Sequence, residues 1–463
     1  VWVCDLVNEQ WVKRPTPIVS VNASTYFERG LTALAVLDDN GIIVSYALEE
    51  DEYNNEIGAN SRLTVNRVSR FPINVSNNTS QSEVILLEVP SIAGNHQGLA
   101  LVEKNGYVFV SIGDGAGGVY LQQAVEDGLI DQANADVFSL MRPQTLNNNP
   151  FGKIMRIDAI DGSAFTDNPF YEGDGDNWNS KIWHIGLRNT FDMCLDLDGN
   201  IILGEVGAGD REEISIGSTT TGGMNFGWGL YEGFNFVGFT SIVNPFTGEI
   251  YSLDQPTDFS ISSELSERLY THKLPSLDYG HNGNEITRLP SFTNGEVTPI
   301  VDSNGIEGNS VTGGTVIVGD GFGEQFNGAY IFSDFTRGWL NIALKGTGES
   351  YFSSVINFAD DNTFDSPVDI TQGFDGEIYV VNLFGDIDVI TYEDTLSVGT
   401  IGEGTKGRGY HNYNNWLEIK EPVNIYNLSG QLVRNIKESG YLDISKGVYL
   451  AVDSNRNTIK IVK

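Results

Sequence analysis

Residues 183–228 read WHIGLRNTFDMCLDLDGNIILGEVGAGDREEISIGSTTTGGMNFGW, and this stretch holds the pattern that decides the fold. Two short apolar runs, 195–197 and 201–203, lie on either side of an Asp-Gly-Asn turn at 198–200. An Asp-Gly turn between two apolar runs is typical of a β-hairpin. We therefore expect a strand, a tight turn and a second strand here.

The same hairpin unit recurs along the chain. Apolar runs surround Asn-Gly or Asp-Gly turns at 39–41, 105–106, 198–199, 327–328 and 375–376. Five irregular copies of one hairpin, in a chain with 53 glycines and few long runs of helical period, indicate an all-β protein of the propeller type. Residues 240–300 are polar, and we expect them to form a long loop-like insertion.

The composition argues against a nucleic-acid-binding, disulfide-rich or membrane-spanning protein. The chain has 463 residues and a formal net charge of −35, so it repels nucleic acids and anionic membranes. It holds only two cysteines, Cys4 and Cys194, which are too few for a disulfide framework. No apolar run is long enough to form a transmembrane segment. The chain starts at Val1 inside a strand-like segment, so we expect a fragment or a processed chain.

Two groups of residues in the opening stretch point to chemistry. Arg188 and Asn189 follow an apolar run and would place a guanidinium fork and an amide at a sheet edge. The alternative is a salt bridge plus a turn residue. Residues 207–209, Gly-Ala-Gly, leave backbone carbonyls accessible beside several carboxylates, a combination that suits calcium. The alternative there is an acidic, solvated loop.

These residues resemble the glucose/sorbosone dehydrogenase family, soluble sugar dehydrogenases that use pyrroloquinoline quinone (PQQ). The family pattern G-x-R-N, D-G, E-[IV]-N and G-N-Y-G-W is similar to Gly-Leu-Arg-Asn at 186–189, Asp-Gly at 198–199, Glu-Ile-Ser at 213–215 and Asn-Phe-Gly-Trp at 225–228. The resemblance implies a six-bladed β-propeller over roughly residues 28–392, with the front of the first blade missing before Val1.

Further matches extend the resemblance. The family's His-x-Gly-Gly motif is similar to His-Gln-Gly-Leu at 96–99, and its S-[IV]-T-G-G motif to residues 310–314. The resemblance then implies a role for each matching residue. His96 would be the general base, with Glu28, Asn95 and Gln97 near the substrate; Arg188, Asn189 and Arg337 would bind the quinone; carbonyls of Gly207 and Ala208 would hold Ca²⁺, and Glu213 would serve a structural Ca²⁺.

This chain also departs from the family pattern. The second glycine of the histidine motif is Leu99, and the usual aspartate before the histidine is Asn95. A lysine that the glucose enzymes present is replaced by Thr336, and residues 366–368 contain neither of two expected arginines. PQQ carries three carboxylates and needs several cations. Two alternatives to a sugar dehydrogenase therefore stay open: a non-catalytic propeller that binds glycans or a protein partner, as in hedgehog-interacting proteins, and a calcium-dependent lactonase.

The composition changes after residue 394. Residues 395–415 are rich in Gly, Asn and Thr, as in a linker. Residues 416–463 form a run of short strands and resemble the C-terminal sorting domain of type IX secretion in Bacteroidetes, through Pro-Val-Asn-Ile-Tyr-Asn-Leu-Ser-Gly-Gln-Leu-Val at 422–433 and Gly-Val-Tyr at 447–449. We thus expect a propeller over 1–394, a linker, and a small C-terminal β-sandwich. The resemblance implies a secreted or cell-surface protein whose partners are the type IX machinery, a sugar and an electron acceptor.

Overall fold

The computed structural model of the chain describes residues 1–7, 10–37, 41–57, 62–136, 139–236, 272–281, 283–293, 296–302, 304–345 and 351–391, with short strands at 242–243 and 250–251 and six strands between 417 and 462. Part of the turn predicted at 39–41 and the whole linker predicted at 395–415 lie outside the described residues. The chain divides into two compact units, Val1–Asp320 with Phe326–Ile390, and Gly321–Gln325 with Thr391–Lys463.

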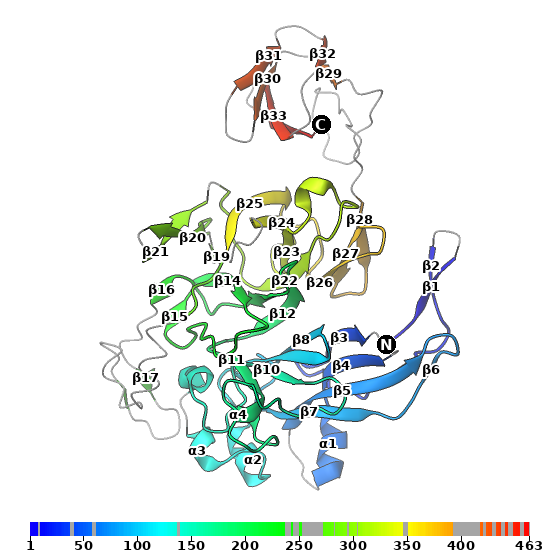
Figure 1. Ribbon diagram of the computed structural model, residues 1–463, viewed down its shortest axis with the longest axis vertical. Coiled ribbons are helices and arrows are strands. Elements are labelled where there is room, and N and C mark those ends of the chain that lie inside the picture. The colour runs from blue at the N-terminus through cyan, green and yellow to red at the C-terminus, as the bar shows by residue number, and fades with distance from the viewer. Residues whose placement is uncertain are drawn as a thin grey trace. The chain divides into compact units, whose positions relative to one another are not determined.

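The first unit is built from antiparallel sheets that follow one another along the chain (Figure 1). The first sheet contains β3 (Leu31–Leu37), β4 (Gly41–Ala47), β5 (Thr64–Asn74), β6 (Thr79–Ser80) and β7 (Val84–Ser91); the second contains β8 (Gly98–Lys104), β9 (Tyr107–Ile112), β10 (Lys153–Asp158) and β11 (Ile182–Ile185). The third contains β12 (Thr190–Leu195), β13 (Ile201–Glu205), β14 (Arg211–Gly217), β19 (Leu277–Gly280), β20 (Thr287–Thr293) and β21 (Glu296–Val301). The fourth contains β22 (Val311–Val316), β23 (Tyr330–Asp334), β24 (Leu340–Lys345) and β25 (Phe352–Ala359), and the fifth β26 (Pro367–Gln372), β27 (Ile378–Asn382) and β28 (Ile387–Ile390).

The first strands of successive sheets are neighbours. β3 packs beside β8, β8 beside β12, β12 beside β22, and β22 beside β26. Sheets that follow one another around their first strands form a β-propeller, so the all-β propeller predicted from the sequence is confirmed. Five blades are present among the described residues, and the sixth stays a prediction.

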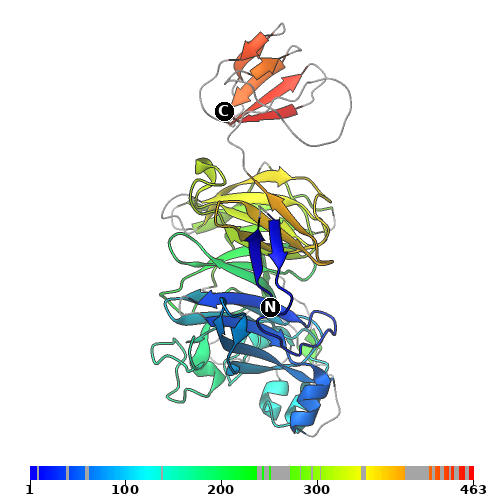
Figure 2. The ribbon, with the colours of Figure 1, turned by 90° about the vertical axis from the view of Figure 1, so that its right-hand side faces the viewer.

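The remaining elements lie in the connections. They are β1 (Cys4–Val7) and β2 (Gln10–Lys13), α1 (Glu50–Ile57), α2 (Leu121–Glu126), α3 (Gln132–Ala135), the 3₁₀ helices Ser139–Gln144 and Glu324–Phe326, α4 (Trp178–Lys181), β15 (Tyr231–Glu232), β16 (Asn235–Phe236), β17 (Ile242–Val243) and β18 (Ile250–Tyr251). Figures 1 and 2 show α1, α2 and α3 together at one end of the propeller, where the chain connects β4 to β5 and β9 to β10.

The predicted turns join the first two strands of each sheet. Between β8 and β9, Asn105 and Gly106 have φ angles of 54° and 82°. Two successive positive φ angles match the right-handed twist of the flanking strands, and Asn-Gly is the favoured sequence for them. The prediction of a loop over 240–300 is wrong for its last part, residues 277–300, because β19, β20 and β21 lie within 277–301. These outer strands contain Pro290 and Pro299, and proline is unusual within a strand.

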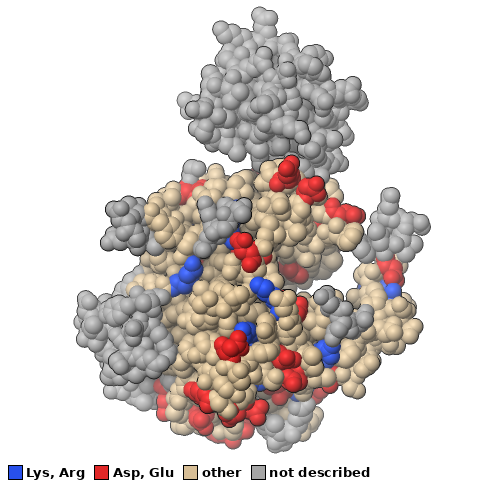
Figure 3. Space-filling model, in the orientation of Figure 1, with Lys and Arg blue, Asp and Glu red and all other residues tan. Residues whose placement is uncertain are grey.

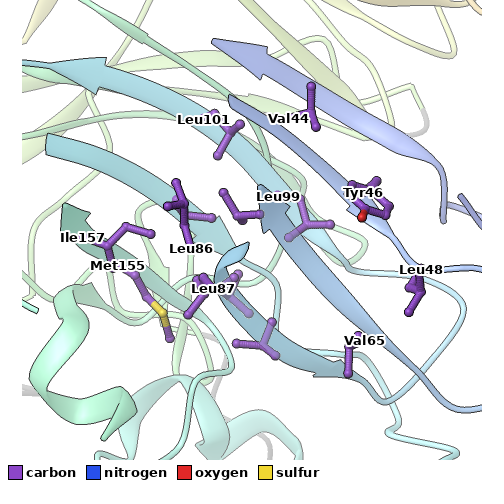
Figure 4. Packing of buried hydrophobic residues seen from close by; sticks show 14 of the residues in the cluster. Val44, Tyr46, Leu48, Val65, Leu86, Leu87, Leu99, Leu101, Met155 and Ile157 are labelled. Carbon is purple, nitrogen blue, oxygen red and sulfur yellow. The ribbon is translucent and has the colours of Figure 1, made fainter. Parts of the chain in front are cut away.

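Apolar side chains fill the layers between neighbouring sheets. Between the first two sheets, buried residues such as Val44, Leu87, Leu99 and Met155 form one cluster (Figure 4). A second cluster joins the second and third sheets, and a third joins the third and fourth. Burying one such side chain contributes about 1.5–3 kcal/mol, so face-to-face packing of the blades holds the site loops in place.

Six strands are described between residues 417 and 462, in the C-terminal unit. They are β29 (Leu417–Ile419), β30 (Val423–Asn427), β31 (Leu432–Ile436), β32 (Gly440–Leu442), β33 (Val448–Asp453) and β34 (Thr458–Val462). One sheet has the order β31-β30-β33-β34, and β29 pairs with β32.

Surface charge, helix length and the cysteines can be compared with what the composition predicts. On the face in Figure 3, Asp and Glu gather along the edges of the propeller and Lys and Arg are scattered. Among the described residues, no helix has the length and apolar character needed to span a membrane. Cys4 and Cys194 are both free thiols.

Candidate functional site

The candidate site lies in loops at one end of the propeller. Strands alternate in direction, so the loops before β8 and β12 and the loops after β9 and β13 meet at the same end. Two hydrogen bonds tie these loops together: Gly98 N donates to Asn189 Oδ1 at 3.1 Å, and Asp114 N donates to the Arg188 carbonyl at 2.7 Å. We call the loops 92–98, 113–116, 186–190 and 206–211 the histidine sector.

His96 and Asp114 form a pair at the centre of this sector. His96 Nδ1 lies 2.7 Å from Asp114 Oδ1, and the His96 side chain keeps 13% of its surface exposed. Burial favours the neutral acid, but the hydrogen bond and charge of His96 and the charge of Arg188 lower the pKa of Asp114. Because an ionised carboxylate only accepts, Nδ1 carries the hydrogen. No described residue forms a hydrogen bond with Nε2. When the ring is neutral, Nε2 is therefore the nitrogen that can take up a proton.

Asp114 is itself held by other groups. Its Oδ1 accepts from Ala116 N at 2.8 Å, and its Oδ2 accepts from Trp228 Nε1 at 2.9 Å. Arg142, which is almost fully buried, donates to the Asp114 carbonyl at 2.8 Å, and burial lowers the pKa of Arg142 to about 10. The orientation of His96 therefore depends on partners far away in the sequence.

The backbone at this pair is strained. His96 has φ 55°, a left-handed conformation that side chains other than glycine rarely adopt. Leu99 stands where the family has glycine, yet it also takes φ 72° while its side chain is fully buried between two sheets. A Cβ added at Gly113 would lie 2.0 Å from the His96 carbonyl oxygen. The loop thus requires glycine at 113 but accommodates leucine at 99 through its packing.

The three residues predicted near the substrate have different surroundings. Glu28 is exposed, and its Oε2 accepts from His96 N at 2.6 Å. Asn95 is half-buried beside it. Gln97 is only 3% exposed, and its amide contacts Ser91, Ala93 and Asn95 within the same loop. Glu28 and Asn95 therefore border the site from its open side, and Gln97 shapes the loop from within.

Arg188 and Asn189 are positioned by a buried glutamate. Glu205 Oε1 accepts from the backbone N–H groups of both residues, and Oε2 accepts from Thr190 Oγ1 at 2.6 Å. Burial raises the pKa of Glu205 to about 7, against the lowering effect of these hydrogen bonds and of the Arg188 charge. The Arg188 guanidinium donates to the Val206 carbonyl at 2.9 Å and lies 5.4 Å from the Trp228 ring centre.

The residues predicted to hold calcium lie beside Arg188. Gly207 lines a cavity of about 10 Å³, enough for one water-sized species, together with Glu205, Glu213 and Glu232. Burial, with repulsion from neighbouring carboxylates, raises the pKa of Glu213 well above its usual value. Among the described residues, no group of three or more His, Cys, Asp or Glu side chains is arranged to hold a metal. A cation here would depend on backbone carbonyls.

A second set of loops at the same end contrasts with the first. Val311 N donates to Glu212 Oε2 and Thr312 Oγ1 to the Pro367 carbonyl, so β14, β22 and β26 begin at one end. Here the Arg337 guanidinium pairs with Glu307 and lies 3.7 Å from Asp361. We call Glu307, 334–337, Asp361 and 366–368 the arginine sector.

Several residues of the site escaped the sequence analysis. Asp114 was visible only as part of a Gly-Asp step after a strand, and Trp228 as part of a motif. Glu205 and Glu232 carried no signal, because carboxylates are common in so acidic a chain. Glu205 bonds to Thr190, 15 residues away, and Trp228 bonds to Asp114, 114 residues away, so only the folded chain brings these groups together.

Comparison of the sequence with known proteins finds matches over part of the chain. The model of the Glucose / Sorbosone dehydrogenase family matches residues 30–257, just under half of the chain. Over 192 aligned residues the chain is 27% identical to the HIPL1 protein of Arabidopsis thaliana. That match covers 37% of this chain and 24% of the relative, so this chain spans about a quarter of the relative's length.

Solved structures share the fold. A glucose dehydrogenase superposes with a TM-score of 0.54 at 15% identity, covering 83% of this chain and 88% of its own. The soluble aldose sugar dehydrogenase of Escherichia coli gives 0.51 at 18% identity, with 80% and 84% covered. The PQQ-bound aldose sugar dehydrogenase of Streptomyces coelicolor gives 0.50 at 13% identity, with 84% and 86% covered. The match over residues 30–257 and the shared propeller together support a relationship of this chain to the glucose/sorbosone dehydrogenase family.

Proposed function

We propose that this protein is a PQQ-dependent sugar dehydrogenase that oxidises an aldose at its anomeric carbon. The observation that carries the proposal is the His96–Asp114 pair, in which a buried carboxylate orients an imidazole whose Nε2 stays accessible. Such a pair is suited to removing a proton from a hydroxyl group near neutral pH. PQQ, when bound, supplies the acceptor for the hydride that leaves the same carbon.

The residues of this chain would divide the work as follows. His96 Nε2 takes the proton of the anomeric hydroxyl, and Asp114 stabilises the imidazolium that results. Glu28 and Asn95 would lie on the substrate side, where Glu28 holds the His96 backbone, and Gln97 would contribute through the loop that its buried amide holds. Arg188, with Asn189, would contact the quinone oxygens and stabilise developing negative charge.

Calcium belongs to the same proposal. The carbonyls of Gly207 and Ala208 would be ligands of the ion that polarises the cofactor, because hard cations prefer oxygen ligands. Glu213 would serve a structural Ca²⁺. The Arg188 guanidinium donates to the carbonyl of Val206, which is in the loop 206–211. A calcium ion held by this loop and the guanidinium would therefore contact the same bound cofactor.

A second candidate is a non-catalytic propeller that binds glycans or a protein partner. The observation that favours it is the arginine sector, where the Arg337 guanidinium is paired with Glu307 and lies near Asp361. Thr336 donates to Asp334 Oδ1 at 2.6 Å, and 366–368 contain no cation. In the leading proposal Arg337 must exchange these partners for a cofactor carboxylate.

The proposal also includes a complete propeller and export. β3 and β28 leave Val36 and Ile387 70% and 59% exposed, which supports a sixth blade packed beside them. The strand motifs within 416–463 support a sorting domain of β-sandwich type that directs the protein through the type IX machinery to the cell surface or medium. Fusing residues 416–463 to a reporter in a Bacteroidetes host should export it, and retention inside the cell would contradict this part.

The enzymatic part is tested by dye reduction. Protein loaded with Ca²⁺ and PQQ should reduce an artificial electron acceptor with one or more aldoses, and His96→Ala should lower turnover roughly 10²- to 10⁴-fold. Full activity in His96→Ala would exclude the proposed base. Absence of turnover in the wild type with every aldose would favour the binding propeller.

A further inference from the structure

Glu232 makes an unusual set of contacts with the loop that carries the calcium assignment. A single oxygen of its carboxylate, Oε1, accepts hydrogen bonds from four successive backbone N–H groups. The donors are Ala208 at 2.8 Å, Gly209 at 2.9 Å, Asp210 at 2.9 Å and Arg211 at 3.0 Å. Glu232 is only 4% exposed, so these charge-assisted bonds form away from competing water.

The contacts fix the direction of the carbonyls in the same loop. In a planar trans peptide the C=O of one residue points opposite to the N–H of the next. Because the N–H groups of Ala208 and Gly209 point at Glu232, the carbonyls of Gly207 and Ala208 point away from it. Within the described residues, neither of these two carbonyls accepts a hydrogen bond. They are therefore oriented and available.

The Glu232 carboxylate also increases the negative charge on these carbonyl oxygens. A peptide whose N–H donates to an anion is polarised, so its carbonyl oxygen becomes more negative and a better ligand for a hard cation. The loop is wrapped too tightly for substitution at its start, since a Cβ at Gly207 would lie 1.7 Å from the Arg211 carbonyl oxygen. Glu232 thus sets both the geometry and the charge distribution of the loop.

We propose that Glu232 is a positioning residue that holds loop 207–211 in the conformation presenting the Gly207 and Ala208 carbonyls to a divalent cation. This inference rests on the proposed function, which assigns these two carbonyls to calcium. Glu232 acts through the four backbone N–H groups that donate to its Oε1.

The test uses the full chain without PQQ. Ca²⁺ binding is measured by calorimetry, and Tb³⁺ binding by luminescence sensitised by tryptophan, for the wild type, Glu232→Gln and Glu232→Ala. Glu232→Gln keeps an acceptor oxygen but loses the charge, so we expect roughly tenfold weaker binding, and roughly hundredfold weaker binding for Glu232→Ala. The matched control is Asp196→Asn, which removes a buried carboxylate bonded to backbone at the other end of β12 and should leave cation affinity unchanged.

A second readout separates positioning from general destabilisation. Hydrogen exchange of the amides at 208–211 should accelerate in Glu232→Ala, and less in Glu232→Gln, whereas Asp196→Asn should not affect these amides. Cation binding that is unchanged in both Glu232 variants would overturn the inference and leave the proposed function standing. A wild type that binds neither ion would overturn the inference together with the calcium assignment. Cation binding without sugar oxidation would argue against the proposed dehydrogenase activity but would leave the proposed role of Glu232 unchanged.

Discussion

The histidine sector and the arginine sector lie at the same end of the propeller but use their carboxylates differently. In the histidine sector, Asp114 and Glu205 accept hydrogen bonds from an imidazole, an indole, a hydroxyl and backbone N–H groups. In the arginine sector, Glu307 and Asp361 lie against the guanidinium of Arg337. The carboxylates beside His96 and Arg188 therefore organise reactive groups, whereas those beside Arg337 neutralise a cation.

This difference explains why the two functional proposals coexist. His96 and Asp114 are paired and oriented, which favours the proposed proton transfer. The cations needed to hold a tricarboxylate cofactor are fewer, and one of them is already paired.

The largest effect is expected for Asp114→Asn. The amide would still fill the space but would no longer stabilise an imidazolium at His96, so turnover should fall roughly 10²-fold or more. Asp196→Asn is the control, because Asp196 is equally buried but pairs with Lys345. Steady-state kinetics on both variants decide the matter. Equal activity of the two would show that the ordered histidine sector serves no catalysis.

A pH-dependent effect is expected at His184, a fully buried residue of β11. Its Nε2 lies 2.9 Å from the Ser218 carbonyl and its Nδ1 accepts from Met224 N at 3.2 Å, so the ring is neutral. Burial lowers its pKa from 6.5 to about 3, with weaker opposing effects of backbone hydrogen bonds. Since the unfolded chain binds this proton more readily, the free energy of unfolding should fall as pH drops from about 6.5 toward 3, by at most roughly 4–5 kcal/mol.

Urea denaturation of wild type and His184→Gln between pH 8 and pH 4 measures this contribution. The difference in unfolding free energy between the two proteins should shrink as the pH falls. A difference that stays constant over the whole range would mean that His184 binds its proton equally well in the folded and unfolded chains.

The smallest effect is expected in the arginine sector. Glu307→Gln removes the main partner of Arg337, which is 30% exposed, and should tighten PQQ binding roughly fivefold, or about 1 kcal/mol. Asp361→Asn, whose oxygen is 3.7 Å from the guanidinium, should have a weaker effect. Calorimetric titration compares the variants. Weaker or unchanged binding in Glu307→Gln would indicate that Arg337 does not contact the cofactor.

Local patterns predicted much of the fold. The Asn-Gly and Asp-Gly turns at 105–106, 198–199, 327–328 and 375–376 each join the first two strands of a sheet, because such turns match the twist of β-hairpins. The same reasoning failed for β20 and β21, where Pro290 and Pro299 interrupt the apolar pattern. Propensity does not reveal that proline is tolerated in the edge strand β21 and in the part of β20 beyond the residues that pair with β19.

The site was predicted less completely than the fold. The family motifs single out His96, Arg188 and Asn189, and the structure brings the three together through the Gly98–Asn189 and Asp114–Arg188 hydrogen bonds. The carboxylates that position them lie on other strands, and no spacing rule connects Trp228 to Asp114 or Glu232 to the loop 208–211. Such contacts follow from the packing of neighbouring strands and loops in the folded chain and are absent from any short stretch of sequence.

The most direct test of the central claim is titration of the calcium-loaded protein with PQQ, followed by dye reduction on a panel of aldoses. We predict binding with a dissociation constant below about 1 μM and turnover of at least one aldose. Absence of both binding and turnover would contradict the account and would mean that the paired Arg337 leaves the site unable to hold the cofactor.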